Sequence, residues 1–191
     1  MSLVQDLPTT NLLPTTPLLP VAGDPAADRA PVADRLRRTL RRQAAGVTVI
    51  TVPGPAGFTA TSFTSVSLDP ALVSFYVSAT ASAAPAVRAA GGFAVHILGR
   101  GQEELAARFA RSGTDRFAGT DWAPDELGTP VLSGVAAWLT ARPVLLQEVG
   151  DHLLVVGEVI DTFARPGVGP LVYHDGAFGG FTPAAGAGHD D

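Results

Sequence analysis

Six hydroxyl side chains crowd into residues 59–67, which read TATSFTSVS. Hydroxyls and neighbouring backbone N–H groups can hydrogen-bond the acceptor atoms of a ligand without placing a charged side chain beside it. The segment follows an apolar, strand-like run and ends at Asp69-Pro70, which is a turn signal. It is therefore either a polar edge strand with its loop or a binding surface.

The sequence lacks the residue patterns of several other kinds of functional site. The histidines at 96, 152, 174 and 189 show neither HxH nor HExxH spacing, so we expect no metal site. A GxSxG elbow for a serine nucleophile is missing. The glycine-rich turns GxGxxG and GxxxxGK[ST] are missing too, which disfavours a nucleotide-binding βαβ sheet. The polar groups that remain suit a phosphorylated small molecule better than a reacting carbonyl.

Composition narrows the class of protein. The chain has 191 residues, 46% of them hydrophobic and 16% charged, which predicts one globular domain. Its 13 basic and 18 acidic residues give a net charge of -5, so we expect neither nucleic acid nor a membrane as partner. It has 0 cysteines, which fits a reducing compartment, and no apolar run long enough to span a bilayer. These features predict a cytoplasmic protein.

Residues 1–30 hold five prolines and show little hydrophobic periodicity, so we expect a tail there. The leucines of this tail could pack on a partner subunit. The globular domain is expected at 31–182 and a flexible tail at 183–191. A surface helix is expected within 33–46, where Leu36 and Leu40 lie on one face and Gly46 is a stop signal.

The remaining elements are mostly strands. Hairpin-like strands are expected at 47–52 and 57–63, followed by strands at 71–78, 93–99 and 170–176. Residues 134–163 hold two more, turning between Glu148 and Asp151. Short helices interrupt them within 82–92 and 101–113. Strands in hairpin order with few helices predict a mainly β fold, an antiparallel barrel or sandwich.

Several motifs together resemble one known family. The phrases AAGVTVIT, GFTATSFTSVSLDPALVSFYV, GGFAVHIL, QEELAARFA, DRFAGTDW, GTPVLSG, VGDHLLVVGEV and PLVYHDGAF follow one another in the order of the short-chain NAD(P)H:flavin oxidoreductases. These are the reductase components of two-component flavin-dependent monooxygenases. The resemblance covers residues 44–178. It implies an FMN-binding split β-barrel, antiparallel and Greek-key-like, with a few short flanking helices.

The resemblance also implies which residues bind the flavin. These are Thr59, Ala60, Thr61, Ser62, Phe63, Ser65, Val66, Thr80, Ala81, Ser82, Ala86, Val87, Ser112 and Gly113. Several relatives place a lysine near the phosphate, and this chain contains no lysine. Positive charge would have to come from Arg88, Arg111 or Arg116, or the site would use hydroxyls and N–H groups alone.

The nicotinamide side of the site is implied by the triplet Gly150-Asp151-His152, which matches the family's GDH motif. His152 is the candidate catalytic residue, although from the residues alone it would be interpreted as a turn histidine. Tyr173 and His174 match the family's C-terminal nucleotide contacts. Asp175 departs from the arginine common there, which leaves the choice between NADH and NADPH open. His96, a lone polar residue in an apolar strand, is interpreted as structural.

The activity implied is hydride transfer from NADH or NADPH to FAD or FMN, with release of reduced flavin to a separate flavin-dependent monooxygenase. Because the cofactors carry this chemistry, no acid-base pair is required. The resemblance further implies a homodimer. The alternative is a non-catalytic flavin-binding split barrel that acts as an electron carrier or sensor.

Overall fold

A computed structural model describes residues 31–184. The tail predicted at 1–30 and most of the tail predicted at 183–191 lie outside the described residues. In chain order the elements are α1 (Val32–Leu40), β1 (Ala45–Gly46), β2 (Thr48–Val52), β3 (Ala56–Ala60), β4 (Thr64–Leu68), β5 (Ala71–Ser78), α2 (Ala84–Ala89), β6 (Phe93–Ile97), α3 (Glu103–Ala110), β7 (Trp122–Pro124), β8 (Pro130–Leu132), β9 (Ala137–Val149), β10 (His152–Ala164), β11 (Leu171–His174) and β12 (Ala177–Gly180).

The helix α1 buries none of its residues, as expected of a surface helix. The chain divides into two units, residues 1–37 and 38–191, and α1 crosses that boundary. Within the first unit, Arg37 pairs with Asp34 at 3.0 Å. The predicted end at Gly46 is wrong: the helix ends at Leu40, because Ala45 and Gly46 form β1 and pair with β11.

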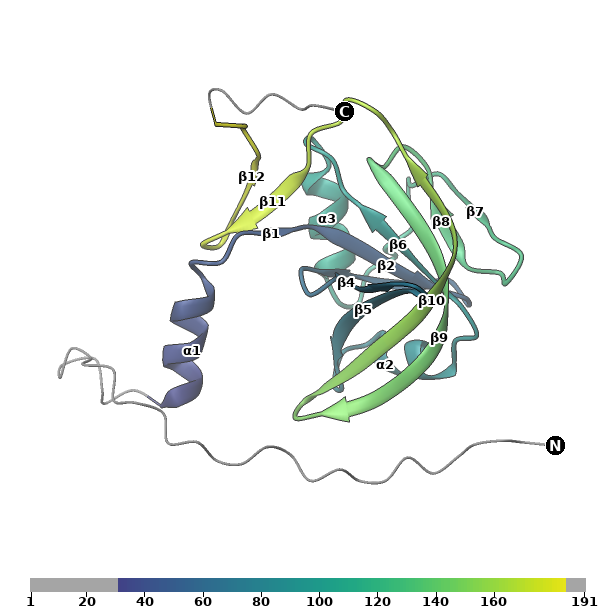
Figure 1. The fold of residues 1–191 in the computed structure, drawn as a ribbon, viewed down its shortest axis with the longest axis horizontal. Helices are drawn as coiled ribbons and strands as arrows, with labels where there is room; N and C mark the ends of the chain where they lie inside the picture. Colours follow the sequence, from purple (N-terminus) through teal and green to yellow (C-terminus); the bar gives the residue numbers. More distant parts are fainter. Residues whose placement is uncertain (1–30, 185–191) are drawn as a thin grey trace. The chain divides into compact units, whose positions relative to one another are not determined.

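The main sheet has seven strands in the order β3-β2-β6-β9-β10-β5-β4 (Figure 1). All its pairings are antiparallel, which confirms the predicted mainly β, antiparallel fold. The strands β3 and β4 are its two edges, although residues 61–63 join them directly in the chain. The sheet therefore has a seam where β3 comes near β5 without pairing with it.

The longest hairpin, β9–β10, turns at the position expected from the sequence. Val149 pairs with His152, so the turn consists of Gly150 and Asp151 alone. Gly150 has φ +61°, and two-residue turns that match the twist of antiparallel strands require positive φ at the first central position. Glycine adopts that conformation without a steric penalty.

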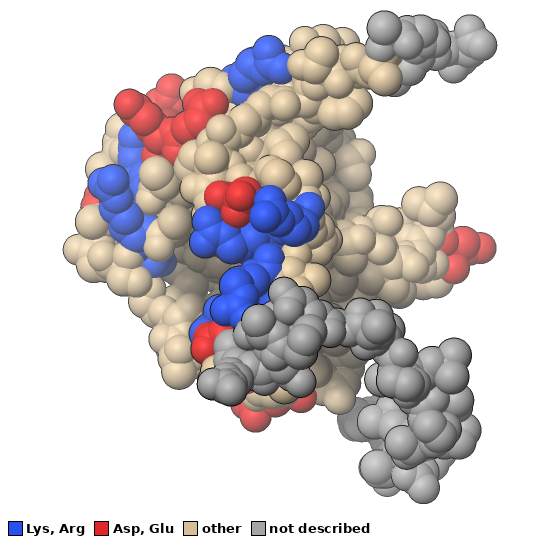
Figure 2. Space-filling view, turned by 90° about the vertical axis from the view of Figure 1, so that its left-hand side faces the viewer, with Lys and Arg blue, Asp and Glu red and all other residues tan. Residues whose placement is uncertain are grey.

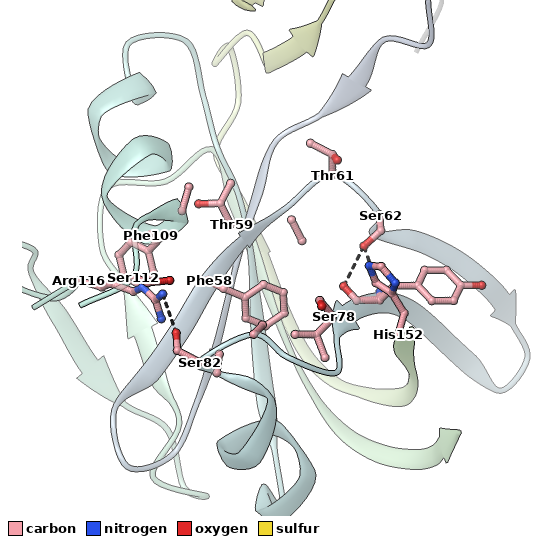
Figure 3. Close-up of a pocket in the computed structure, with 16 residues that line it drawn as sticks. Phe58, Thr59, Thr61, Ser62, Ser78, Ser82, Phe109, Ser112, Arg116 and His152 are labelled. Atoms are coloured by element: carbon pink, nitrogen blue, oxygen red, sulfur yellow. Dashed lines mark hydrogen bonds between the residues drawn. The ribbon is translucent and has the colours of Figure 1, made fainter. Parts of the chain in front are cut away.

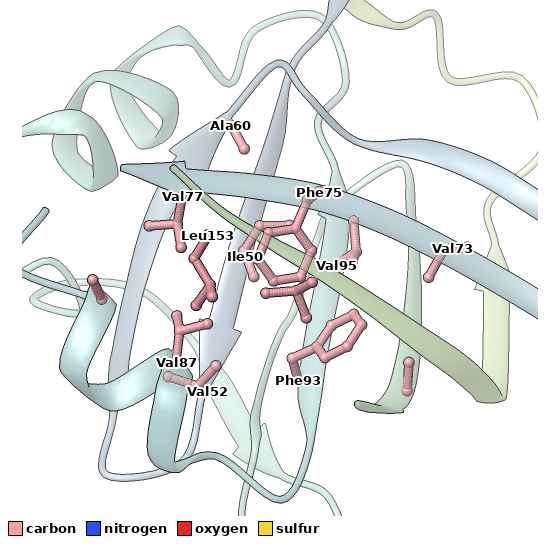
Figure 4. Packing of buried hydrophobic residues seen from close by; sticks show 13 residues of the cluster. Ile50, Val52, Ala60, Val73, Phe75, Val77, Val87, Phe93, Val95 and Leu153 are labelled. Carbon is pink, nitrogen blue, oxygen red and sulfur yellow. The ribbon is translucent and has the colours of Figure 1, made fainter. Parts of the chain in front are cut away.

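Alternate residues of β2, β5, β6 and β10 fill the main core, shown in Figure 4. Phe75 lies at its centre, with ring centroids 5.9 Å from Phe58 and 5.1 Å from Phe93. Gly157 of β10 lies against the Phe93 ring, where an added Cβ would be only 2.4 Å from ring carbons. The core thus fixes how β10 lies against β6.

A smaller sheet, β1-β11-β12, lies beside the main one. Its β11–β12 hairpin turns at Asp175 and Gly176, and Asp175 has φ +48°. Arg41 Nε donates to the Asp175 carboxylate at 2.8 Å, and the Asp175 N–H donates to the Arg41 carbonyl at 3.2 Å. This guanidinium lowers the pKa of the Asp175 carboxyl below its ordinary value. The ion pair therefore ties the hairpin turn to the segment after α1.

The charged surface is mixed rather than uniform. On the face shown in Figure 2, basic and acidic side chains gather in small groups close to one another. Pairs such as Arg88–Glu148, at 2.8 Å, join charges of opposite sign. None of the helices within residues 31–184 has both the length and the apolar character needed to cross a membrane.

Candidate active site

A cavity of about 390 Å³ opens at the seam of the main sheet, between β3 and the end of β5. The lining residues come from five places: β3 with the segment after it, the end of β5, the segment before α2, the end of α3 with the loop that follows, and the first residue of β10. They are Phe58, Thr59, Ala60, Thr61, Ser62, Tyr76, Val77, Ser78, Ala81, Ser82, Ala83, Phe109, Ala110, Ser112, Arg116 and His152. In Figure 3, Arg116, Ser82 and Ser112 lie at one end and Ser62, Ser78 and His152 at the other.

Arg116 brings a positive charge to the first end. Its Nε donates to the Arg111 carbonyl at 2.7 Å and its Nη1 to the Gly57 carbonyl at 2.8 Å. Its Nη2 donates to Ser82 Oγ at 3.0 Å (Figure 3). All three acceptors are neutral, and no carboxylate among residues 31–184 forms an ion pair with Arg116. A guanidinium has five N–H donors, so this uncompensated cation can still receive an anion.

The hydroxyls of the predicted binding strand divide into two kinds. Thr59 Oγ1 donates to the Ala106 carbonyl of α3 at 2.6 Å. Ser62 Oγ accepts the Tyr76 N–H at 3.0 Å and donates to the Tyr76 carbonyl at 3.2 Å, so it fastens the β3–β4 connection to β5. By contrast, the hydroxyls of Thr61 and Ser112 bond to no residue of the described chain. Both hydroxyls are free to donate to a ligand.

His152 occupies the other end because β10 begins there. It pairs with Ser78 across β5–β10, which places both residues at the same edge of the cavity. Its Nδ1 lies 2.6 Å from Asp151 Oδ1, and its side chain is 44% exposed. The ring is thus held by the hairpin turn while remaining accessible.

The structure brings eight of the seventeen predicted site residues together. Those lining the cavity are Thr59, Ala60, Thr61, Ser62, Ala81, Ser82, Ser112 and His152. Gly113 lies nearby, in a smaller hollow that also includes Ser82 and Arg116. The others lie outside the cavity and are Phe63, Ser65, Val66, Thr80, Ala86, Val87, Tyr173 and His174.

The residues outside the cavity have other surroundings. Val87 is 2% exposed in the core, against which Phe63 and Ala86 also pack. Ser65 and Val66 lie on the edge strand β4, and the Thr80 hydroxyl lies 3.1 Å from that of Ser78. Tyr173 and His174 belong to the small sheet, where the Tyr173 ring contacts Phe178. Their predicted contacts with the nucleotide stay predictions.

Of the three arginines left open by the sequence, the cavity contains Arg116 alone among the described residues. Arg88 instead pairs with Glu148 of β9. Sequence reasoning did not include the apolar wall formed by Phe58, Val77 and Phe109. It also missed Tyr76 and Ser78, although the alternation of β5 places these two on the face opposite the buried Phe75 and Val77.

His96 is structural, as predicted. The ring is 0% exposed, Nδ1 lies 3.0 Å from the Val49 carbonyl, and Nε2 accepts the Leu132 N–H at 2.9 Å. Burial lowers its pKa to about 4. Among residues 31–184, no three or more His, Cys, Asp or Glu side chains cluster as a metal site requires.

Sequence comparison identifies related proteins. A model of the family described as flavin reductase like domain matches residues 40–182. An NADH:FMN oxidoreductase of Rhodococcus erythropolis is 44% identical over 171 residues, covering 85% of this chain and 89% of that protein. The reductase subunit HsaB of a flavin-dependent monooxygenase from Mycobacterium tuberculosis is 36% identical over 152 residues, covering 77% of this chain and 81% of that protein.

Structural comparison gives a consistent result. An NADH:FAD oxidoreductase of Streptomyces globisporus, solved in complex with NAD and FAD fragments, is 39% identical. It superposes with a TM-score of 0.76 over 87% of this chain and 99% of that chain.

Proposed function

This chain belongs to the family of flavin reductase like domains, and we propose that it is an NAD(P)H:flavin oxidoreductase of the EC 1.5.1 type. It reduces FMN or FAD with a nicotinamide dinucleotide and releases reduced flavin to a separate monooxygenase. The split β-barrel implied by the motifs is confirmed by the likeness to flavin reductase structures. The observation that carries the proposal is one cavity with an uncompensated arginine at one end and an accessible histidine at the other.

The donor set fits the phosphorylated end of a flavin. Arg116 is held in place by two carbonyls and one hydroxyl, so its position is set before a ligand binds. A phosphate would supply the negative charge that no described residue supplies. The free Ser112 hydroxyl lies at the same end and adds a neutral donor.

The middle of the cavity fits a flat, partly apolar ring. Phe58, Val77 and Ala81 give it apolar walls, and the free hydroxyl of Thr61 can donate to a ring carbonyl. A volume of about 390 Å³ lies in the range of small-molecule sites. Ser62 supports this wall indirectly, because its hydroxyl is bound to the backbone of Tyr76.

The His152 end is the proposed nicotinamide side. When both nucleotides are bound, nicotinamide supplies the hydride and flavin accepts it. The chain's own residues hold the two rings in position and exclude water, which is the protein's share in such chemistry. His152 and Ser78 stand in register on paired strands, so this wall is a rigid one.

Steady-state kinetics test the proposed function. We expect oxidation of NADH, or of NADPH, to require added flavin, measured with FMN, FAD and riboflavin in turn. Turnover without added flavin, by a flavin that remains bound, would instead favour the electron carrier. A protein that oxidises neither dinucleotide with any of the three flavins would refute the proposal.

We further propose that the chain acts as a homodimer. Residues 142–149 of β9 pair only with β10, and residues 159–164 of β10 pair only with β9, so each of the two strands leaves one stretch of its other edge unpaired. The exposed apolar side chains there are Val144, Leu145, Leu146, Val149, Ile160 and Phe163. Unpaired apolar edges of this kind favour association unless they are covered, and we propose that a second copy covers them. A monomer by light scattering at micromolar concentration would contradict this.

Similarity to related proteins also supports a partner oxygenase for this chain. The Mycobacterium tuberculosis relative is a reductase subunit of a flavin-dependent monooxygenase. We propose an equivalent division of labour for this chain in the cytoplasm, where reduced nicotinamide dinucleotides are supplied. Stimulation of substrate oxidation when the reductase is added to its oxygenase would support it.

A further inference from the structure

The turn before His152 is fixed to the neighbouring strand. Asp151 is the second of the two turn residues, and its carbonyl accepts the Ala79 N–H at 2.9 Å. Because Ala79 directly follows β5, the backbone of Asp151 is held at the edge of the cavity. The side chain of Asp151 therefore starts from a defined position beside the His152 ring.

The contact between these two side chains selects one form of the ring. Asp151 Oδ1 lies 2.6 Å from His152 Nδ1. An ionised carboxylate only accepts hydrogen bonds, so Nδ1 must carry the proton. In the neutral ring Nε2 is then an acceptor, and no described residue bonds to it.

The buried His96 shows what an imidazole in this form does. Its Nδ1 faces an acceptor, the Val49 carbonyl, and its Nε2 accepts the amide N–H of Leu132 at 2.9 Å. His152 also has an acceptor at Nδ1 and lines the cavity, but its Nε2 bonds to no described residue. Its natural partner is an amide N–H brought by the ligand.

We propose that Asp151 is a positioning residue that holds His152 in the Nδ1–H form, so that Nε2 accepts an N–H of the nicotinamide carboxamide. The inference rests on the proposed function for the identity of the dinucleotide. Asp151 itself does not contact the ligand. It acts through the ring of His152, by setting which nitrogen donates and which accepts.

The expected effect is moderate because the pair is exposed. The side chain of Asp151 is 94% exposed and that of His152 is 44% exposed, so water weakens their interaction. Losing one neutral hydrogen bond to the dinucleotide should raise the KM for NADH about threefold to tenfold. Flavin affinity should not change.

Two readouts on the full chain with bound flavin test the inference. Imidazole ¹⁵N shifts, recorded about two pH units above the ordinary histidine pKa, report the protonated nitrogen directly. We expect Nδ1–H in the wild type and a shift toward Nε2–H in Asp151→Asn, because the new amide can donate to Nδ1. The KM for NADH should rise in Asp151→Asn and recover in part in Asp151→Glu.

The matched control is Glu148→Gln, which also removes one negative charge from this end of the hairpin. Glu148 pairs with Arg88 and forms neither a hydrogen bond nor an ion pair with His152, so the control should leave both the ¹⁵N shifts and the KM unchanged. An Nε2–H ring in the wild type, or an equal rise of KM in Glu148→Gln, would overturn the inference. Failure of the proposed function would appear differently, as a wild-type protein that does not oxidise NADH at all.

Discussion

The buried His96 makes stability depend on pH in a way that can be measured. Its ring is fully enclosed, and burial lowers its pKa from 6.5 to about 4. Protonation would put a second N–H on Nε2, directly facing the Leu132 N–H that this nitrogen now accepts. In the unfolded chain the ring is solvated and takes up a proton near its ordinary pKa.

The sign of the effect follows from this difference. Below pH 6.5 the unfolded state binds a proton that the folded state does not bind until about pH 4, so acid favours unfolding. The contribution of His96 is complete above pH 6.5 and is lost as the pH falls toward 4. At 1.36 kcal/mol per pH unit, the loss is about 2 kcal/mol by pH 5 and about 3 kcal/mol by pH 4.

Urea unfolding of the wild type and of His96→Asn, at several pH values and at fixed protein and flavin concentrations, is the assay. The variant keeps every other titratable group, so the difference between the two curves isolates His96. We expect the variant to be less stable by about 1–3 kcal/mol near neutral pH, because the Leu132 N–H loses its acceptor. Between pH 6.5 and pH 5 the wild type should lose the greater stability. Parallel curves over that interval would refute the reasoning.

Four other substitutions probe the fold and the cavity. Gly157→Ala places a Cβ 2.4 Å from the Phe93 ring and should cost about 2 kcal/mol or more by denaturant unfolding; an unchanged midpoint would mean that the core yields freely. Arg116→Gln should weaken FMN binding about tenfold to a hundredfold and leave riboflavin binding nearly unchanged, because only FMN carries the phosphate. Titration calorimetry measures both affinities, and equal losses for the two ligands would contradict the assignment. Thr61→Val should lower flavin affinity about threefold to tenfold. Ser62→Ala should mainly lower the melting temperature, because the Ser62 hydroxyl binds the Tyr76 backbone. A larger loss of flavin affinity in Ser62→Ala than in Thr61→Val would show that Ser62 is the direct ligand.

Local chemistry made the hairpins predictable. The strand Ala71–Ser78 and the turn at Gly150 lie where the β-branched runs and the glycine place them. The strand β12 was missed, although Asp175-Gly176 is a strong hairpin signal. Its sequence, AFGG, has neither the length nor the β-branched composition from which a strand is recognised.

The site residues that belong to one segment of the chain could be predicted from the sequence. Those brought to the cavity by contacts between distant segments were harder to predict. Residues 59–62 line the cavity together because they are consecutive. Arg116 lies beside them only because the loop after α3 folds back to Gly57 and Ser82, a long-range contact that no local pattern encodes. Val87 shows a second limit of the sequence: its motif matches a flavin contact, but the sequence does not reveal that its side chain packs in the core of this chain.

The two ends of the cavity depend on different parts of the molecule. Arg116 is held by Gly57 at the start of β3, by Ser82 before α2, and by the loop after α3. His152 is held by the turn of β9–β10 and by its pairing with β5. No hydrogen bond of one arrangement involves a side chain of the other. A change at Arg116 should therefore alter the proposed phosphate end of the cavity without moving the ring of His152. A flavin reductase takes up oxidised flavin, reduces it and releases it. Separate ends of the cavity suit this cycle, because the affinity for flavin can be weakened at one end while the proposed geometry for hydride transfer is kept at the other.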